Sequence, residues 1–181
     1  MNFKNNSFLV SCICGLLSFS SCSVNKAKID NDLKKYFDAK NADGCFTMLD
    51  NSNGSVTVYN MAMDTVRVLP ASTFKIINSL IGLETGRITD ENMIIEWDGI
   101  KRGNAEWNRD MNMNDAFKKS NLPYYQEVAR RIGYDTMKLW VDSIAYVNKD
   151  LSGPVASFWL NNKLKISPDE QFGLMKRLYF D

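Results

Sequence analysis

The chain has 181 residues, and its 22 Lys and Arg residues are nearly balanced by 21 Asp and Glu residues, for a formal net charge of +1. The charges are interspersed and form no basic stripe, so nucleic-acid binding is not expected. The chain contains no histidine, which excludes Ser-His-Asp and Cys-His catalysis and any histidine-ligated zinc site. A nucleophile must therefore find its base among lysine, acidic residues or tyrosine, and we expect no metal site.

The first residues are typical of an export signal. Lys4 supplies a positive charge, and the apolar run at 7–17 is too short to span a bilayer as a mature helix. The small residues of "SFSSC" end at Cys22, as in a lipoprotein signal whose cysteine is lipidated and becomes the new N-terminus. Ordinary signal cleavage near the same place is the alternative. We expect an exported protein of the periplasm or outer membrane, with this anchor as its membrane contact.

The chain is divided on this basis into a signal segment at 1–22, a tether with a short helix at 23–43 and a folded domain at 44–181. Three side chains of the short helix are expected to face inward: Leu33, Tyr36 and Phe37. Two β-rich runs at 45–60 flank Asn53-Gly54, which is a strong hairpin signal. Cys45 is the one cysteine after residue 22, so no disulfide framework is expected, and we predict a small buried strand residue.

From residue 70 onward the pattern is mainly helical. A first helix is predicted to begin near Ser72 and end at Gly86, with an apolar stripe formed by Phe74, Ile77, Leu80 and Ile81. A loop-rich segment at 87–110, anchored by Trp97 and Trp107, follows it. Further helices are predicted at 113–120, 122–133, 135–144 and 167–181, the last with Ser167 as its N-cap and Pro168 at its first position. A hairpin followed by several helices predicts a mixed α+β fold.

The segment "PASTFK" at 70–75 carries the first chemical signal. Ser72 and Lys75 are three positions apart, so both lie on one face of the predicted helix. The helix N-terminus would also favour a negative charge that develops on Ser72. The simpler interpretation of the pair is a capping serine next to a lysine whose ammonium reaches solvent.

Three later segments add to this signal. "PASTFK" is followed in order by Ser120 in "KKSNLPYYQEVARRIG", by Tyr146 and Asn148 in "YVN", and by Trp159 in "FWL". From about residue 44 to 179, this ordered set resembles the class D (oxacillinase-type) serine β-lactamases. The resemblance implies the β-lactamase and penicillin-binding transpeptidase-like fold, with a helical region and part of an antiparallel sheet. Taken singly, Ser120 could cap the next helix, Trp159 could be a core residue, and Tyr146 and Asn148 could belong to a turn.

By this resemblance, Ser72 would attack the β-lactam ring and become acylated. Lys75 would be carboxylated on its side-chain nitrogen by CO2 and would then act as the general base. Trp159 would donate its indole N–H to the carbamate, and Ser120 would relay a proton to the leaving nitrogen. Two apolar neighbours are expected around the lysine: Phe74 and Leu122. Carbamate formation needs a neutral amine, and burial lowers the pKa of a lysine. No other cofactor is implied, and the partner is a β-lactam.

The sequence departs from the family pattern at three points. Leu122 stands where the Ser-x-Val motif has valine, and Val147 stands where Tyr-Gly-Asn has glycine. The chain ends at Asp181, before the family's Lys-Thr/Ser-Gly strand, its further strands and its C-terminal helix. We therefore expect a fragment that is inactive or impaired as a β-lactamase. The alternatives are a penicillin-binding sensor or transpeptidase-like domain, or a non-catalytic remnant.

Overall fold

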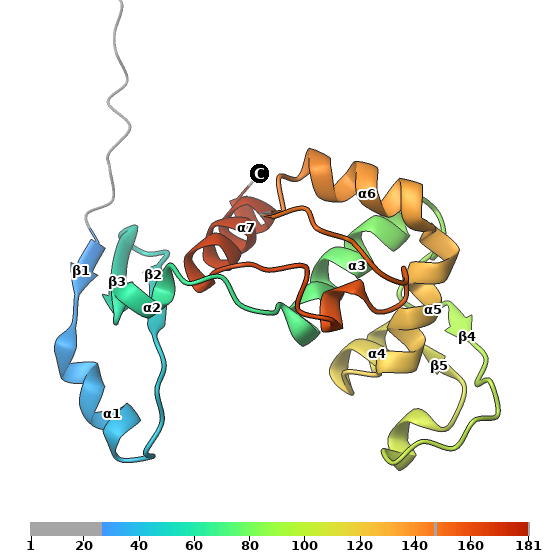
Figure 1. The fold of residues 1–181 in the computed structure, drawn as a ribbon, viewed down its shortest axis with the longest axis horizontal. Coiled ribbons are helices and arrows are strands. Elements are labelled where there is room, and N and C mark those ends of the chain that lie inside the picture. The colour runs from blue at the N-terminus through green and yellow to red at the C-terminus, as the bar shows by residue number, and fades with distance from the viewer. Residues whose placement is uncertain (1–26, 147, 181) are drawn as a thin grey trace, which may run out of the picture.

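The structure is a computed structural model that describes residues 27–146 and 148–180. The signal segment with Cys22 therefore lies outside the described residues, as does Val147. A small N-terminal sheet and a larger helical region lie on either side of helix α7 (Figure 1). The elements of the N-terminal end are β1 (Ala27–Ile29), a 3-10 turn (Asn31–Leu33), α1 (Lys34–Asp38), β2 (Phe46–Asp50), β3 (Ser55–Tyr59) and α2 (Met61–Asp64).

The N-terminal sheet has β3 at its centre. Strand β2 pairs with it antiparallel, and the Gly54 N–H donates to the Asp50 carbonyl at 2.7 Å to close the turn, where Gly54 has a φ of 70°. The predicted hairpin at Asn53-Gly54 is confirmed. Strand β1 pairs with β3 parallel, so the prediction of a plain tether is wrong at residues 27–29. Three residues give no readable alternation, and only the neighbouring strand makes them a strand.

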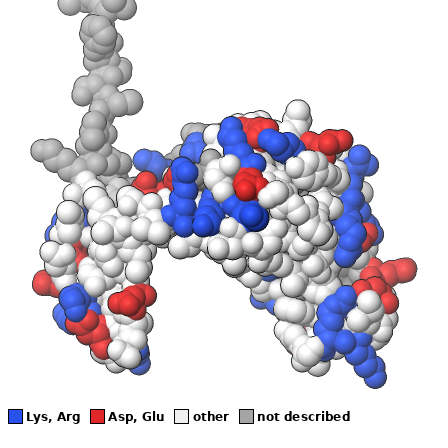
Figure 2. Space-filling model, in the orientation of Figure 1, with Lys and Arg blue, Asp and Glu red and all other residues white. Residues whose placement is uncertain are grey.

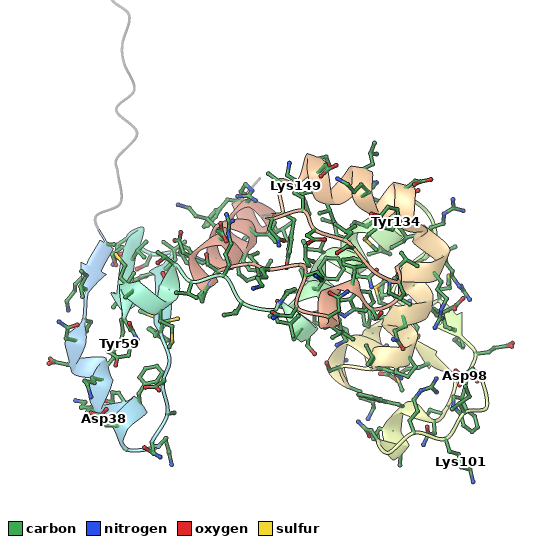
Figure 3. The ribbon with its side chains drawn as sticks, viewed as in Figure 1. Asp38, Tyr59, Asp98, Lys101, Tyr134 and Lys149 are labelled. Atoms are coloured by element: carbon green, nitrogen blue, oxygen red, sulfur yellow. The ribbon has the colours of Figure 1, made fainter. Side chains whose placement is uncertain are left out.

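Two side-chain predictions for this end of the chain are wrong. Tyr36 was expected to face inward, but it is 63% exposed. The five-residue helix α1 has one covered face, and Phe37 occupies it by stacking on Tyr59, which is labelled in Figure 3, with ring centroids 4.8 Å apart. Cys45 lies just before β2 and is half-buried, rather than being a buried strand residue.

The helical region begins with a 3-10 turn that runs directly into the first long helix. Its elements are that 3-10 turn (Ala71–Thr73), α3 (Phe74–Glu84), β4 (Ile94–Ile95), a second 3-10 turn (Ala105–Trp107), β5 (Met111–Asn112), α4 (Met113–Lys118), α5 (Leu122–Ile132), α6 (Tyr134–Ser143), a third 3-10 turn (Phe158–Leu160) and α7 (Pro168–Phe180). The predicted helices are confirmed within a few residues. The loop-rich segment also contains β4, which pairs antiparallel with β5.

The core of this region is the contact between α3 and α5. Phe74, Ile77 and Ile81 of α3 are fully buried, as the apolar stripe predicts. The two helices approach closely at Gly82, where a Cβ would lie 3.2 Å from the Val128 side chain. Leu139 of α6 is apolar but 68% exposed, because the buried face of α6 is formed by other residues: Met137 and Val141.

Helix α7 begins with the predicted cap. The Ser167 N–H donates to the Glu170 carboxylate at 2.9 Å, and the Glu170 N–H donates to Ser167 Oγ at 3.2 Å, which is a capping box. Pro168 is the first helical residue. Figure 2 shows Lys and Arg side chains, with acidic side chains among them, over the place of α7 in Figure 1. No helix in the described part of the chain is long and apolar enough to cross a membrane.

Candidate active site

Ser72 and Lys75 meet at the start of α3. The 3-10 turn that contains Ser72 continues into α3, so the lysine follows the serine by one turn. The Lys75 ammonium donates to Ser72 Oγ at 2.9 Å. Lys75 is only 5% exposed, so the interpretation of a lysine reaching for solvent is wrong. Neither residue immediately before the two helical segments, Pro70 or Thr73, makes a side-chain cap, and Ser72 is exposed.

Ser120 reaches the site because α4 ends with a tight turn. The Ser120 N–H donates to the Phe117 carbonyl at 3.1 Å and the Asn121 N–H to the Ala116 carbonyl at 2.8 Å, which is a Schellman motif. The Asn121 side chain then accepts from the Tyr124 N–H at 3.0 Å and caps α5. The interpretation of Ser120 as the cap of the next helix is therefore wrong, and its hydroxyl is free to face α3.

Ser120 completes a triangle of polar groups. The Lys75 ammonium also donates to Ser120 Oγ at 2.9 Å, and the Ser120 hydroxyl donates to Ser72 Oγ at 3.1 Å. Ser120 has a φ of 48°, and Ala71, next to Ser72, has a φ of 46°. Such left-handed positions cost a non-glycine residue about 1–3 kcal/mol and cluster at functional sites. The two strained positions lie directly at the triangle.

The lysine of the triangle is biased towards its neutral form. Burial lowers the pKa of Lys75 below its ordinary value. No carboxylate among the described residues contributes to this pKa, so no ion pair restores the charge. A lysine with a lowered pKa and a serine hydroxyl at 2.9 Å is an arrangement that can activate the serine as a nucleophile.

Trp159 packs against Phe74, the residue that precedes the lysine. Its ring is fully buried and stacks on the Phe74 ring, with centroids 5.5 Å apart and an interplanar angle of 22°. Its indole Nε1–H has no hydrogen-bond partner among the described residues. Buried N–H groups rarely lack a hydrogen-bond acceptor, and one that does is typical of a position where an ion, a water molecule or a ligand binds.

The remaining predicted residues are placed less directly. Tyr146 is 2% exposed and packs edge-on against Phe74 at 5.6 Å. Asn148 is exposed and joins two parts of its own loop, since its amide donates to the Lys163 carbonyl at 2.6 Å. Leu122 is the first residue of α5 and packs against the core. Nothing in the described structure brings Asn148 to the triangle.

Two residues near the triangle were missed by the sequence reasoning. The Lys75 ammonium lies 5.8 Å from the centre of the Tyr125 ring, and Ser79 Oγ lies 2.8 Å from the Tyr125 hydroxyl. Tyr125 falls on the buried face of a predicted helix, which is the one signal the sequence offers. Nothing in the sequence pairs it with a lysine fifty positions earlier.

A cavity lies elsewhere in the helical region. It measures about 400 Å³ and lies between the β4–β5 pair and α5, with Trp97 and Trp107 among its lining residues. Most of its charged residues form ion pairs, as in Arg130–Glu127 and Arg102–Asp98, the latter labelled at Asp98 in Figure 3. Ser72, Lys75 and Ser120 do not line it. The described residues contain no cluster of His, Cys, Asp and Glu that could hold a metal ion.

Comparison with known proteins identifies the family. Residues 35–181 match the family described as "Penicillin binding protein transpeptidase domain". The chain belongs to this family. The "Probable beta-lactamase YbxI" of Bacillus subtilis is 38% identical over 156 residues, which are 86% of this chain and 56% of the relative. The chain thus spans a little over half the length of this curated relative.

Solved structures of the family show the same fold. A class D β-lactamase from Nostoc has a TM-score of 0.79 and 36% identity, over 83% of this chain and 64% of that one. The C-terminal domain of the Bacillus licheniformis BlaR penicillin-receptor has a TM-score of 0.80 and 34% identity, over 84% of this chain and 61% of that one. The predicted class D β-lactamase-like fold is confirmed, and the similar structures include both a class D β-lactamase and a penicillin-receptor domain.

Proposed function

We propose that this chain carries the nucleophile and base of a class D-type serine β-lactamase, which opens the β-lactam amide through an acyl-enzyme at Ser72. The observation that carries the proposal is the triangle of Ser72, Lys75 and Ser120, with sides of 2.9, 2.9 and 3.1 Å. The similarity to β-lactamases supports the substrate class. The chain covers only part of the length of these relatives, so the β-lactamase activity of this chain is itself proposed.

The proposal gives each hydroxyl a role. Neutral Lys75 takes the Ser72 proton as the serine oxygen bonds to the β-lactam carbonyl carbon, which is general base catalysis at hydrogen-bond distance. When the ring C–N bond breaks, the leaving nitrogen needs a proton. The Ser120 hydroxyl bonds to both other members, so it can donate its proton to that nitrogen and regain one from Lys75. Protons and bonds balance, and Ser72 ends acylated.

We propose further that Lys75 reacts with CO2 on its side-chain nitrogen. Two features fit this group: burial lowers the pKa of Lys75, and the indole N–H of Trp159 is buried without a partner among the described residues. A carboxylated lysine supplies a carboxylate base that can activate the water needed for deacylation. Trp159 would hold it, and Phe74 would exclude water through its stack on the indole.

A sensor is the second candidate, and the similarity to the BlaR penicillin-receptor domain favours it. Both candidates acylate Ser72, and they differ in how fast the acyl group leaves. The test is to mix the protein with one equivalent of penicillin and to follow the adduct by intact mass spectrometry. An adduct that disappears while free penicilloate accumulates supports the hydrolase. An adduct that persists supports the sensor, and the absence of any adduct contradicts both.

The Trp159→Phe variant tests the role of the indole. It keeps an aromatic ring against Phe74 but removes the N–H, and a hydrogen bond to a charged group is worth about 1.5–3 kcal/mol, or roughly 10- to 100-fold. We therefore expect that a half-maximal carbamate signal, observed by NMR with ¹³C-labelled bicarbonate, requires a bicarbonate concentration roughly 10- to 100-fold higher. Trp140→Phe on α6 is the matched control and should leave the signal unchanged. An unaltered signal in Trp159→Phe contradicts the proposed contact.

Cys22 is proposed to carry lipid, and this residue lies outside the described part of the chain. The Cys22→Ala variant of the full chain should move from the membrane fraction to the soluble fraction, because one thioether-linked lipid and its acyl chains hold the protein at the bilayer. Cys45→Ala changes the other cysteine of the exported chain and should not alter partitioning. Equal partitioning of Cys22→Ala and the unaltered chain points to ordinary signal cleavage.

A further inference from the structure

Tyr125 presents the face of its ring to the proposed base. The Lys75 nitrogen lies 5.8 Å from the ring centroid, which is within the range of a cation–π contact. Tyr125 is fully buried and Lys75 is 5% exposed, so little water screens the interaction. The negative face of an aromatic ring attracts an ammonium group and repels an anion placed over it. Tyr125 therefore favours one charge state of the lysine.

The ring is fixed from several sides. The Tyr125 hydroxyl shares a 2.8 Å hydrogen bond with Ser79 Oγ, one turn beyond Lys75 on α3. The Tyr125 carbonyl accepts from the Asn78 amide at 3.0 Å. Phe117 of α4 packs edge-on against the ring at 6.5 Å. These contacts join α3, α4 and α5, so the ring face cannot turn away from Lys75 without breaking one of them.

The other titratable groups on the surrounding elements leave this contact unopposed. Burial raises the pKa of all three nearby phenols, so they remain uncharged at neutral pH: Tyr124 and Tyr125 on α5 and Tyr146 after α6. Lys119, next to Ser120, is paired with Glu106. The Lys75 pKa is lowered by burial, with no carboxylate acting on it among the described residues. Among the described residues, the Tyr125 ring therefore joins the Ser72 and Ser120 hydroxyls as a group that favours the ammonium against burial.

We propose that Tyr125, held by Ser79, is a positioning residue that keeps part of the Lys75 amine in its ammonium form and raises the CO2 concentration that the site requires. This inference rests on the proposed function. In the step concerned, the lone pair of neutral Lys75 bonds to the carbon of CO2, and the amine releases one proton to solvent. The ring face opposes the step twice, by stabilising the ammonium before it and by repelling the carboxylate after it.

The test titrates Lys75 directly in the full chain. The protein is labelled with ¹³C at lysine Cε, and the Lys75 signal is assigned by its loss in Lys75→Arg. In Tyr125→Leu we expect the titration midpoint to fall by about one pH unit, the size expected for a partly desolvated cation–π contact. The bicarbonate concentration for half-maximal carbamate signal should fall about tenfold. Tyr125→Phe keeps the ring face and its packing against Phe117 but loses the bond to Ser79, so the midpoint should change by much less than in Tyr125→Leu.

Two controls separate this effect from a change in packing. Tyr124→Leu opens a similar space on the same helix, but the Tyr124 hydroxyl donates to the Met93 carbonyl and its ring makes no cation–π contact with Lys75. Increasingly fluorinated phenylalanines at position 125 keep the ring's shape while weakening its negative face, and should lower the midpoint stepwise, whether or not Tyr125→Leu folds.

Each outcome decides a different point. A midpoint that is unchanged across the fluorinated series, or that shifts equally in Tyr124→Leu, overturns the role of Tyr125. A stepwise shift without a carbamate signal in any variant overturns the proposed CO2 chemistry and leaves the effect of the ring on the ammonium standing. The two proposals therefore fail separately.

Discussion

The Ser72→Ala variant is expected to lose covalent labelling by a fluorescent penicillin by at least about 10³-fold, as expected for removal of the nucleophile of a serine hydrolase. Ser120 is the obvious competitor, because it also lies 2.9 Å from the Lys75 nitrogen. The two serines differ in their backbone. The Ser120 N–H already donates to the Phe117 carbonyl, whereas Ser72 lies in the first turn of a helical segment, where N–H groups lack helical partners and can hold an oxyanion.

Peptide mapping by mass spectrometry locates the label. Ser120→Ala is the matched control: labelling should be slower, because a proton relay is lost, but the label should still be on Ser72. Circular dichroism of both variants checks that the fold is retained. A label that stays at full strength in Ser72→Ala, or that maps to Ser120 in the unaltered chain, would falsify the assignment of the nucleophile.

Replacing Lys75 with alanine has the second large expected effect. A positioned general base contributes roughly 10²–10⁴-fold to a rate, so the acylation of Ser72 should slow by that factor in Lys75→Ala. In the unaltered chain the rate should fall as the pH falls, because protonation removes the lone pair that accepts the Ser72 proton. Since burial lowers the pKa of Lys75, the midpoint should lie below the ordinary lysine value.

The measurement is the acylation rate as a function of pH and of added bicarbonate, read by stopped-flow fluorescence. Bicarbonate should raise the rate of the unaltered chain, because the carboxylate of the proposed carbamate then replaces the amine as the base, and should have no effect on Lys75→Ala. Lys118→Ala, which changes an exposed lysine near the end of α4, should reproduce the unaltered pH profile. A rate that does not depend on pH across the neutral and alkaline range would contradict a base role for Lys75.

The sequence by itself determined the local features of this protein. The hairpin at Asn53-Gly54 and the cap at Ser167 each depend on residues that are at most four positions apart in the sequence. The helical phase of α3 places Lys75 one turn after Ser72, because residues three apart share a helix face. The ordered motifs led to the family and its fold without reference to the structure.

The tertiary structure decided which chemical groups meet. Ser120 comes to Lys75 across 45 positions because a Schellman turn ends α4 and Asn121 takes over the capping of α5. The sequence could not rank Ser120 against Asn121 as the cap, since both residue types serve that role. Nor could it show that Lys75 is buried, because the burial of a side chain depends on which elements pack around it.

The same reason explains the wrong predictions. Tyr36 was expected to face inward, but only one face of the short helix α1 is covered, and Phe37 occupies it. Residues 27–29 become a strand only because β3 offers an edge to them. Tyr125 fits any buried helix face, and it became part of the site because α5 packs on α3 at the level of Lys75. Local patterns fix which face of an element is apolar, and long-range packing fixes what that face meets.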